Sequence, residues 1–576
     1  MKYATSPVLT LTLPVWRSRL LAFAFVSLFV VLIARAGYLQ GMHNDFLQAK
    51  GESRYSRVIE ITASRGRILD RNGEPLAITT PVKSIWAIPD EVKISRKQIA
   101  RLAELLEMPA QEIDKRVTDT ARDFVFIKRQ VSPETADRVA ELRIPGLFQN
   151  REYRRYYPGG EIMAHVLGFT GADDIGQEGI ELAFQETLAG KPGSRRVIKD
   201  RLGQIVEDVQ SIKAAQNGRD LVLALDTRVQ NLAYSHLKSA VEKHRAKAGS
   251  IVVVDVSTGE VLALANAPAY NPNKRSRLSG AQFRNRAITD TFEPGSTLKP
   301  FTIALALQAG KVRPNTLIQI APGGFGIGAA TIRDTHAERT LTVAQVIQKS
   351  SNIGAARIAL SLPAASMWEM FQHAGFGAAP NLGFPGEATG KLRPYRSWRP
   401  IEQATMAYGH GISVSLVQLA RAYTMFAREG DMVPLSLLRV DAAPSAQRVI
   451  APETARAVRA MLELAVHSGG TAPRAQIMGY RVAGKTGTAQ KQENGAYSSS
   501  RYVSSFVGFA PASNPRLVIA VMIDEPSDGL YYGGTVAAPV FAQVMTGALR
   551  VLDVTPDGPM TPIELPSEGD EVKESI

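Results

Sequence analysis

The 576-residue chain contains no cysteine. Disulfide bridges, thiolate nucleophiles and cysteine-bound zinc are therefore excluded from its fold and chemistry. Its eight histidines form no ligand-like pair such as H-E-x-x-H, so the sequence offers no metal site, and no cofactor is expected. Any covalent catalysis must begin at an oxygen or nitrogen nucleophile.

Acidic residues are absent from the amino-terminal segment 1–19, which contains Lys2, Arg17 and Arg19. A mostly apolar run follows at 20–40 and has the length that a bilayer requires. Because positive charge stays on the cytoplasmic side, we expect a short cytoplasmic segment, a transmembrane anchor at 20–40 and everything beyond it outside. A cleaved signal peptide is the alternative, but the run is long for one and no clear cleavage site follows.

The overall composition is that of a globular protein, with 45% hydrophobic and 21% charged residues. The length predicts two or three folded units. The formal net charge of +13 is compatible with nucleic acid, anionic lipid or an acidic polymer. Charge alone therefore selects no partner.

Three regions follow the predicted anchor. Residues 41–218 are charged, broken by glycine and proline, and alternate short strand-like runs with helical ones, which indicates an extended module. Residues 219–553 are mainly helical in the middle and strand-like near both ends. The acidic, proline-containing tail 554–576 is expected to be disordered.

The strand-like runs of residues 219–553 occur as two pairs. Residues 250–256 and 261–266 read as a β-hairpin, and 504–512 with 516–524 read as a second antiparallel pair. Strands at both ends of a helical region predict one α+β domain whose first and last strands share a sheet.

A serine and a lysine with helical spacing lie in the sequence EPGSTLKP at 293–300, before the apolar run FTIALALQAG. We expect Ser296 to be the first residue of a largely buried helix and Lys299 to lie one turn above it. A free serine hydroxyl needs an adjacent base, and a desolvated lysine can act as one. Ser296 is therefore the predicted nucleophile and Lys299 the predicted base. Ser235 and Lys238 have the same spacing, but they sit within an amphipathic helix and are read as surface residues.

Two further motifs distinguish the Ser296–Lys299 pair from the Ser235–Lys238 pair. Ser350 and Asn352 form an S-x-N motif, and Lys485 begins a K-T-G motif. Their order is that of penicillin-binding proteins and serine β-lactamases. Ser350 can relay a proton between Lys299 and a leaving amine, and the Asn352 amide can bind a substrate peptide group.

The second motif continues through Thr486, Gly487 and Thr488. Lys485 would attract a substrate carboxylate, and the two threonine hydroxyls would donate to it. Gly487 would let the strand backbone approach the substrate closely. The Thr488 amide, together with that of Ser296, would form an oxyanion hole.

The sequence closely resembles class B penicillin-binding proteins, in particular their division-specific D,D-transpeptidases. Besides the three motifs, the resemblance rests on RGRILDRNGEPLA (65–77), RYYPGGEIMAHVLGF (155–169), GQEGIE (176–181), YGHGISVSLVQLA (408–420) and YYGGTVAAPVF (531–541).

This resemblance implies an α+β fold with one transmembrane helix, an elongated pedestal of the dimerisation type at 41–218, and a transpeptidase domain at 219–553. The latter would resemble serine β-lactamases, with a five-stranded antiparallel sheet flanked by helices. The pedestal residues Arg65, Asp70, Arg71 and Glu181 would form structural charge networks.

The resemblance also implies the reaction and its setting. The nucleophile would attack the D-Ala-D-Ala bond of a peptidoglycan stem peptide during septal wall synthesis, release D-alanine and pass the acyl group to a neighbouring amine. β-Lactams would acylate the same serine. The expected location is the bacterial inner membrane, single-pass, with a periplasmic catalytic domain. The expected partners are lipid-linked glycan strands, a membrane glycosyltransferase of the FtsW kind and other division proteins, without nucleic acid.

Asn352 favours the division branch, because elongation-type relatives usually carry aspartate there. The departure from some close relatives is His410, which replaces a second aromatic beside Tyr408 in a predicted substrate-binding loop. An imidazole near the pocket would respond to pH, although a histidine that merely fills the cleft wall is the commoner case. A specialised paralogue, a D,D-carboxypeptidase, a β-lactamase, and a β-lactam sensor or scaffold in the division complex remain as alternatives.

Overall fold

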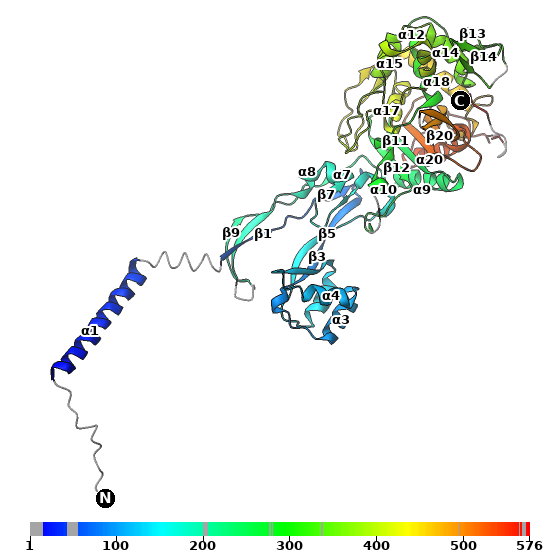
Figure 1. Cartoon of the computed structure of the whole chain (residues 1–576). Coiled ribbons are helices and arrows are strands. Elements are labelled where there is room, and N and C mark those ends of the chain that lie inside the picture. Colours follow the sequence, from blue (N-terminus) through cyan, green and yellow to red (C-terminus); the bar gives the residue numbers. More distant parts are fainter. Residues whose placement is uncertain are drawn as a thin grey trace. The chain divides into compact units, whose positions relative to one another are not determined.

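The computed structural model describes residues 15–42, 56–199, 205–275, 278, 280–335, 338–493, 495–563, 565–566 and 572–575. These residues form two compact units (Figure 1). The first comprises the described residues before Ser64 together with Lys191–Asn217, and the second comprises Ser64–Gly190 and the described residues from Gly218 onward. Much of the predicted pedestal therefore belongs to the same unit as the catalytic domain.

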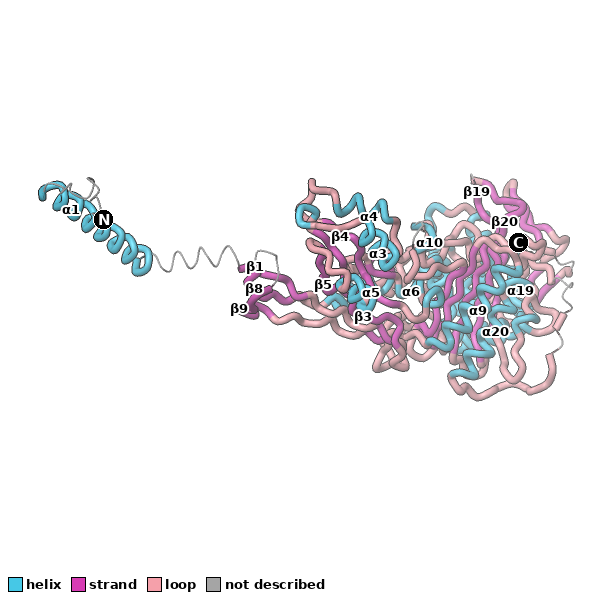
Figure 2. The backbone as a smooth tube through the Cα atoms, turned by 90° about the horizontal axis from the view of Figure 1, so that it is seen from below, coloured by secondary structure: helices cyan, strands magenta, loops and turns pink. Residues whose placement is uncertain are grey.

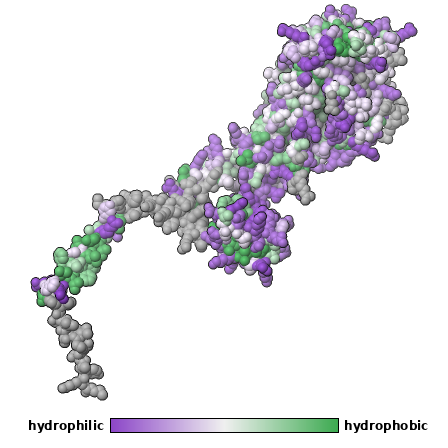
Figure 3. All heavy atoms as spheres, viewed as in Figure 1, coloured by the Kyte–Doolittle hydropathy of each residue, from purple (hydrophilic) through white to green (hydrophobic). Residues whose placement is uncertain are grey.

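The first unit begins with helix α1 (Val15–Gly37), which continues into a π-helical turn at Tyr38–Met42. Apolar side chains cover most of the visible face of α1 (Figure 3), and residues 15–40 are long and apolar enough to cross a membrane once. The predicted anchor is therefore confirmed as a helix, although it begins five residues earlier than its apolar run suggests. The unit also contains a three-stranded antiparallel sheet in the order β1-β8-β9, with bounds Ser56–Ile61, Gly193–Lys199 and Ile205–Lys213.

The second unit contains a sheet in the order β10-β2-β3-β4, with β5 also paired to β3. Its strands are β2 (Ile68–Leu69), β3 (Pro75–Ala87), β4 (Val125–Val131), β5 (Leu147–Tyr156) and β10 (Leu221–Val222). Three amphipathic helices cover it, α3 (Arg96–Leu106), α4 (Ala110–Val117) and α5 (Pro133–Ala140). Ile85, Leu102 and Ile127, all fully buried, lie in the core between these strands and helices.

A charge network lies beside this sheet. The buried carboxylate of Glu181 accepts from Arg65 Nε at 2.6 Å and from Arg155 Nε at 2.7 Å. Asp70 accepts from the Thr227 hydroxyl at 2.9 Å, and Arg71 pairs with Glu260 at 3.4 Å. These contacts confirm the predicted structural role of the pedestal charges. The short elements of this region are α6 (Ala164–Leu167), β6 (Phe169–Thr170), β7 (Gly176–Glu178), α7 (Gly179–Ala183) and α8 (Gln185–Ala189).

Residues 248–524 contribute a five-stranded sheet in the order β12-β11-β21-β20-β19, in which every neighbouring pair is antiparallel. Figure 2 labels two of its strands, β19 and β20. The strands are β11 (Ala248–Asp255), β12 (Val261–Ala267), β19 (Ala483–Glu493), β20 (Ala496–Ala510) and β21 (Leu517–Asp524). Both predicted strand pairs and their shared sheet are confirmed.

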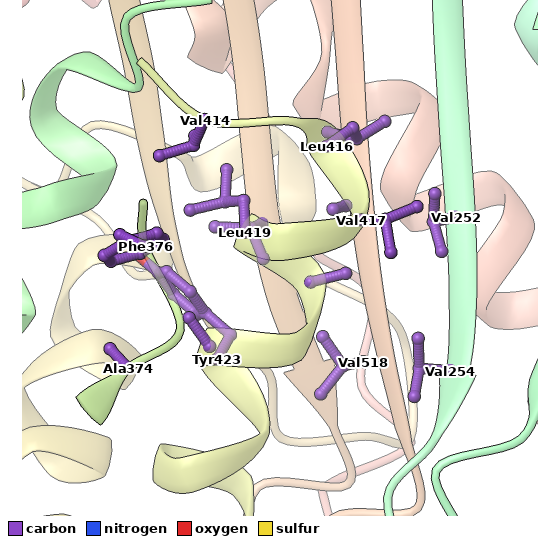
Figure 4. Close-up of a cluster of buried hydrophobic side chains, with 14 of the residues drawn as sticks. Val252, Val254, Ala374, Phe376, Val414, Leu416, Val417, Leu419, Tyr423 and Val518 are labelled. Atoms are coloured by element: carbon purple, nitrogen blue, oxygen red, sulfur yellow. The ribbon is translucent and has the colours of Figure 1, made fainter. Parts of the chain in front are cut away.

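Successive side chains of a strand point to opposite faces of the sheet, so each face presents its own set of side chains. Helices cover both faces of this sheet. On one face Ile251 and Val253 pack with α9 (Thr227–Lys243) and α20 (Ala538–Val551). On the other, Val252 and Val254 face α17 (Leu416–Ala427), as Figure 4 shows. β11 is buried along its whole length, which fixes the sheet as the middle layer.

Several of the remaining helices pack on the α17 side of the sheet, whereas α19 (Gly533–Val536) packs with α20 on the other side. The other remaining helices are α10 (Gly280–Phe283), α11 (Arg286–Thr289), α12 (Lys299–Gln308), α13 (Val343–Gln348), α14 (Asn352–Leu360), α15 (Ala364–His373), α16 (Pro400–Met406) and α18 (Pro452–Val466). Short strand pairs are β13 (Leu317–Gln319) with β16 (Thr340–Thr342), β14 (Gly324–Ile327) with β15 (Ala330–Arg333), and β17 (Asp431–Met432) with β18 (Gln447–Arg448).

The tail 554–576, expected to be disordered, makes defined contacts where the structure describes it. The Asp557 carboxylate accepts from the Arg481 backbone amide at 2.7 Å and from the Ser513 hydroxyl at 2.6 Å. Further along, Glu574 and Ser575 are almost completely buried. The acidic composition did not indicate these partners, because each of them is contributed by a distant part of the chain.

Candidate active site

The predicted nucleophile lies in a tight turn at the edge of the sheet. Ser296 is part of a 3-10 turn, Gly295–Leu298, and α12 begins only at Lys299. The prediction that Ser296 is the first residue of the helix is therefore wrong in detail. The Thr297 hydroxyl donates to the Pro294 carbonyl at 2.7 Å and holds the tighter turn before the helix proper.

Three glycines bring this turn against its neighbours. A Cβ on Gly409, which has φ +87°, would lie 2.2 Å from the Gly295 carbonyl oxygen. A Cβ on Gly487 would lie 2.7 Å from the Pro294 carbonyl oxygen, so only glycine lets β19 lie beside the turn. The structure shows the close approach of Gly487 to the turn that carries Ser296, and the predicted approach to the substrate stays a prediction.

Lys299 is fully buried and its amino group points at the predicted nucleophile. Its Nζ lies 2.8 Å from Ser296 Oγ, 3.0 Å from Ser350 Oγ and 2.5 Å from the Ser350 carbonyl oxygen. The one-turn spacing predicted from the sequence is thus realised as a direct contact.

Ser350 joins the two lysines. Its Oγ lies 3.0 Å from Lys485 Nζ as well as 3.0 Å from Lys299 Nζ. Ser350 has φ +59°, a left-handed conformation that costs a non-glycine residue free energy and is retained where the surroundings enforce it. Lys485 also donates to the Thr486 hydroxyl at 3.1 Å. One hydroxyl therefore lies within proton-transfer distance of both amino groups.

Both lysines favour the uncharged form more than a lysine in water. Burial lowers the pKa of Lys299 well below its usual value, and the positive charge of Lys485 adds to that effect. Burial likewise lowers the pKa of Lys485 to about 8. An uncharged Lys299 beside Ser296 is the arrangement that a general base requires.

The S-x-N segment is fixed by Asp334, a residue that the sequence did not single out. Its carboxylate accepts from the Asn352 amide at 2.6 Å, from the Ile353 amide at 3.1 Å and from the Ser351 hydroxyl. These amides begin α14, where a carboxylate offsets the positive end of the helix dipole. No sequence signal marks Asp334, because it acts from a loop 18 residues before Asn352.

Asn352 itself is buried, and its side-chain Oδ1 has no hydrogen-bond partner in the described part of the protein. A buried acceptor left without a donor costs free energy that a bound donor would recover. This geometry is compatible with the predicted contact to a substrate peptide N–H group.

The predicted carboxylate-binding hydroxyls lie along β19. Thr486 Oγ1 is 2.8 Å from Thr471 Oγ1, and Thr488 Oγ1 accepts from the Gly533 amide at 3.0 Å. A Cβ on Gly295 would lie 3.3 Å from the Thr488 carbonyl oxygen, so the backbone around Thr488 lies against the Ser296 turn. The three motifs, which together span more than 180 residues of the sequence, therefore meet at one place.

Tyr408 and His410 form part of the wall beside Lys299. The Tyr408 ring centroid is 6.0 Å from Lys299 Nζ, and the His410 ring contacts the rings of Tyr408 and Tyr497 at centroid distances of 5.1 and 5.5 Å. Burial is the main cause that lowers the pKa of His410 to about 4. His410 is therefore an uncharged, aromatic-packed side chain at neutral pH.

Glu293 is a second residue that the sequence analysis did not assign. It precedes the Ser296 turn, accepts from the Gly411 amide at 2.8 Å and from the Tyr497 hydroxyl at 3.3 Å, and has a pKa raised by burial. It ties the start of the nucleophile segment to the loop that carries His410.

The second serine–lysine pair lies outside this site. Ser235 is exposed, and Lys238 pairs with Glu161 at 3.0 Å on a half-exposed face of α9. Within the described residues no group of three or more acidic or histidine side chains could hold a metal ion.

Residues 249–546 match the family described as the penicillin binding protein transpeptidase domain, and residues 60–223 match the penicillin-binding protein dimerisation domain. The probable peptidoglycan D,D-transpeptidase PenA of Neisseria gonorrhoeae is 44% identical over 542 residues, which are 93% of each chain. The peptidoglycan D,D-transpeptidase FtsI of Escherichia coli K12 is 41% identical over 548 residues, 94% of this chain and 93% of the relative. The solved transpeptidase domain of penicillin-binding protein 3 from Burkholderia pseudomallei is 49% identical, with a TM-score of 0.55, and the match covers 58% of this chain and 98% of that domain.

Proposed function

The chain belongs to the penicillin-binding protein family, and on that premise we propose that it is a membrane-anchored serine D,D-transpeptidase that cross-links peptidoglycan stem peptides. The observation that carries this proposal is the 2.8 Å contact between Lys299 Nζ and Ser296 Oγ in a fully buried setting that favours the uncharged amine.

The chemistry follows from those contacts. Uncharged Lys299 accepts the hydroxyl proton while Ser296 Oγ bonds to the carbonyl carbon of the penultimate D-alanine. The peptide C–N bond breaks, the proton passes through Ser350 to the leaving amine, and D-alanine departs. The amine of a second stem peptide then attacks the acyl carbon, the bond to Oγ breaks, and Ser296 recovers its proton.

Substrate recognition uses the neighbouring groups. Lys485, Thr486 and Thr488 bind the terminal carboxylate, and the backbone amides of Ser296 and Thr488 receive the negative charge that develops on the carbonyl oxygen. The close approach of the Gly295 turn to Thr488 supports this pairing of amides. A β-lactam follows the same first step, but its amine stays attached after ring opening, so the acyl-enzyme persists.

The location in the cell and the process are proposed from the positive charges before and at the start of α1 and from the relatives. Lys2, Arg17 and Arg19 retain the amino terminus in the cytoplasm, so that α1 crosses the inner membrane and the catalytic part lies in the periplasm. The FtsI relative and Asn352 support a role in septal wall synthesis beside a membrane glycosyltransferase of the FtsW kind.

The test is covalent labelling. The full-length protein, incubated with a fluorescent penicillin and digested, should carry the adduct on the peptide that contains Ser296. The Lys299→Met variant should label about 10³-fold more slowly, the range of a general base. Lys238→Met removes a lysine of the same motif spacing and should label at the parental rate. An adduct elsewhere, or parental labelling of Lys299→Met, would contradict the proposal.

Product analysis separates transfer from hydrolysis. With lipid-linked glycan strands and a glycosyltransferase of the FtsW kind, the full-length protein should yield dimeric cross-links. Trimmed tetrapeptides without dimers would instead indicate a D,D-carboxypeptidase.

A further inference from the structure

Two residues of the described segment 572–575, Glu574 and Ser575, lie against the candidate active site. Glu574 is 1% exposed and Ser575 3% exposed, values usual for a protein core rather than for a chain end. A glutamate is almost never buried this completely unless it is paired. Its position therefore requires a binding site for the carboxylate.

Thr488, one hydrogen-bond partner of Glu574, and Lys485, whose charge acts on Glu574, are groups assigned above to the substrate carboxylate. Its Oε2 accepts from the Thr488 hydroxyl at 3.2 Å, and its Oε1 accepts from the Gly534 amide at 3.3 Å. The positive charge of Lys485 acts on the same carboxylate and lowers its pKa, against the larger effect of burial, which raises it. The side-chain carboxylate of Glu574 therefore occupies the place proposed for the terminal carboxylate of D-alanine.

The next residue contacts the segment beside the S-x-N motif. The Thr335 backbone amide donates to Ser575 Oγ at 3.1 Å, and Thr335 directly follows Asp334, whose carboxylate holds Asn352. Glu574 and Ser575 thus connect the K-T-G strand with the segment that fixes the S-x-N motif. A stem peptide bound between these motifs would need the same space.

The docked carboxylate is held by two long hydrogen bonds, of 3.2 Å from the Thr488 hydroxyl and 3.3 Å from the Gly534 amide. Such a ligand binds weakly and gives way to a substrate or β-lactam that goes on to form a covalent bond. Tethering offsets this weakness, since a segment of the same chain acts at an effective concentration of about 1 mM.

We propose that the carboxy-terminal segment 572–575 is a built-in pseudosubstrate, which fills the carboxylate pocket through Glu574 and slows acylation of Ser296 until it is displaced. This inference rests on the proposed function, because it takes its meaning from the carboxylate pocket of a D,D-transpeptidase. In this proposal the tail is itself the ligand, a peptide that presents a side-chain carboxylate to the pocket.

The first test measures the second-order rate of acylation by a fluorescent penicillin in the full-length protein. Glu574→Gln removes the charge but keeps the shape, and should raise the rate about tenfold, the effect expected for one charge-assisted hydrogen bond. Glu571→Gln makes the same change of charge in the same tail and should leave the rate at the parental value. Equal rates in the parent and Glu574→Gln would overturn the inference.

The second test supplies the tail in trans. A synthetic peptide of residues 565–576 should slow acylation of Glu574→Gln in competition with the penicillin, and the same peptide with glutamine at position 574 should not. Equal effects of the two peptides would overturn the inference, while labelling of Ser296 in every sample would leave the proposed function standing. Absence of any adduct on Ser296 would instead refute the proposed function itself.

Discussion

Lys299 and Lys485 place their amino nitrogens 3.0 Å from the same atom, Ser350 Oγ. Two protonated amines this close to one buried oxygen repel each other, and the repulsion lowers the pKa of Lys299 further. The proton held between these groups belongs to the pair rather than to either lysine. We therefore expect the rate of acylation to depend on the protonation state of these two lysines.

The first prediction is a bell-shaped pH profile of acylation. Because a lysine with a lowered pKa is uncharged above that pKa, the rate should rise as Lys299 loses its proton. It should fall again near pH 8, where Lys485 loses the charge that attracts a carboxylate. Acylation rates of a fluorescent penicillin between pH 5 and 10 check this. A rate that still increases at pH 10 would show that the charge of Lys485 is not needed.

The second prediction concerns His410. Its pKa of about 4 keeps the imidazole uncharged between pH 5 and 8, so it has no proton to exchange in that range. His410→Tyr should therefore have a profile of the same shape as the parent, although its absolute rate can differ. Acylation measured at half-unit steps from pH 5 to 8 decides the matter. If one limb of the pH profile is present in the parent and absent in His410→Tyr, then His410 does act as a pH sensor.

The third prediction compares two glycines of one loop. Gly409→Ala should destabilise the protein by about 3 kcal/mol and slow acylation, because its Cβ would overlap the Gly295 carbonyl in addition to the backbone strain. Gly411→Ala meets nothing closer than 3.6 Å, so only its positive φ costs free energy, about 1 kcal/mol. Denaturant unfolding and penicillin labelling of both variants test the difference. Equal losses would mean that the Gly409–Gly295 approach is unimportant.

The fourth prediction concerns the buried charge network. Glu181→Gln leaves Arg65 and Arg155 without their buried counter-ion and should cost about 3–5 kcal/mol. Glu104→Gln removes an exposed partner of Arg101 and should cost about 0.5 kcal/mol or less. Thermal unfolding measures both. Labelling of Ser296 in the folded fraction of Glu181→Gln should persist, since no catalytic atom contacts the network.

The sequence predicts the parts of the fold that depend on local patterns. The hairpins around residues 250 and 510, the anchor helix and the Ser296–Lys299 spacing follow from periodicity, length and turn residues. The geometry of the 3-10 turn before α12 does not follow, because it depends on how Gly487 and Gly409 close around it.

The roles of residues whose partners lie elsewhere in the sequence could not be predicted from local patterns. Asp334 lies in a loop, and its role depends on a fold that carries it to the start of α14. Glu574 belongs to a segment whose composition is that of a disordered tail, so only its burial in the structure draws attention to it. Motif order predicted the three groups of candidate catalytic residues, which the structure brings together, while the residues that position them could be found only from three-dimensional contacts.

The order of strands in the catalytic sheet has a consequence for biosynthesis. β11 lies between β12 and β21, and β21 ends only at Asp524, so β11 gains its second neighbour about 260 residues after it is made. Pairing over such a sequence separation is slow, because a long loop must close first. A nascent chain of this protein consequently carries an unpaired edge of β11 while the residues between Asp255 and Leu517 are made, and its catalytic sheet is complete only after β21 has emerged.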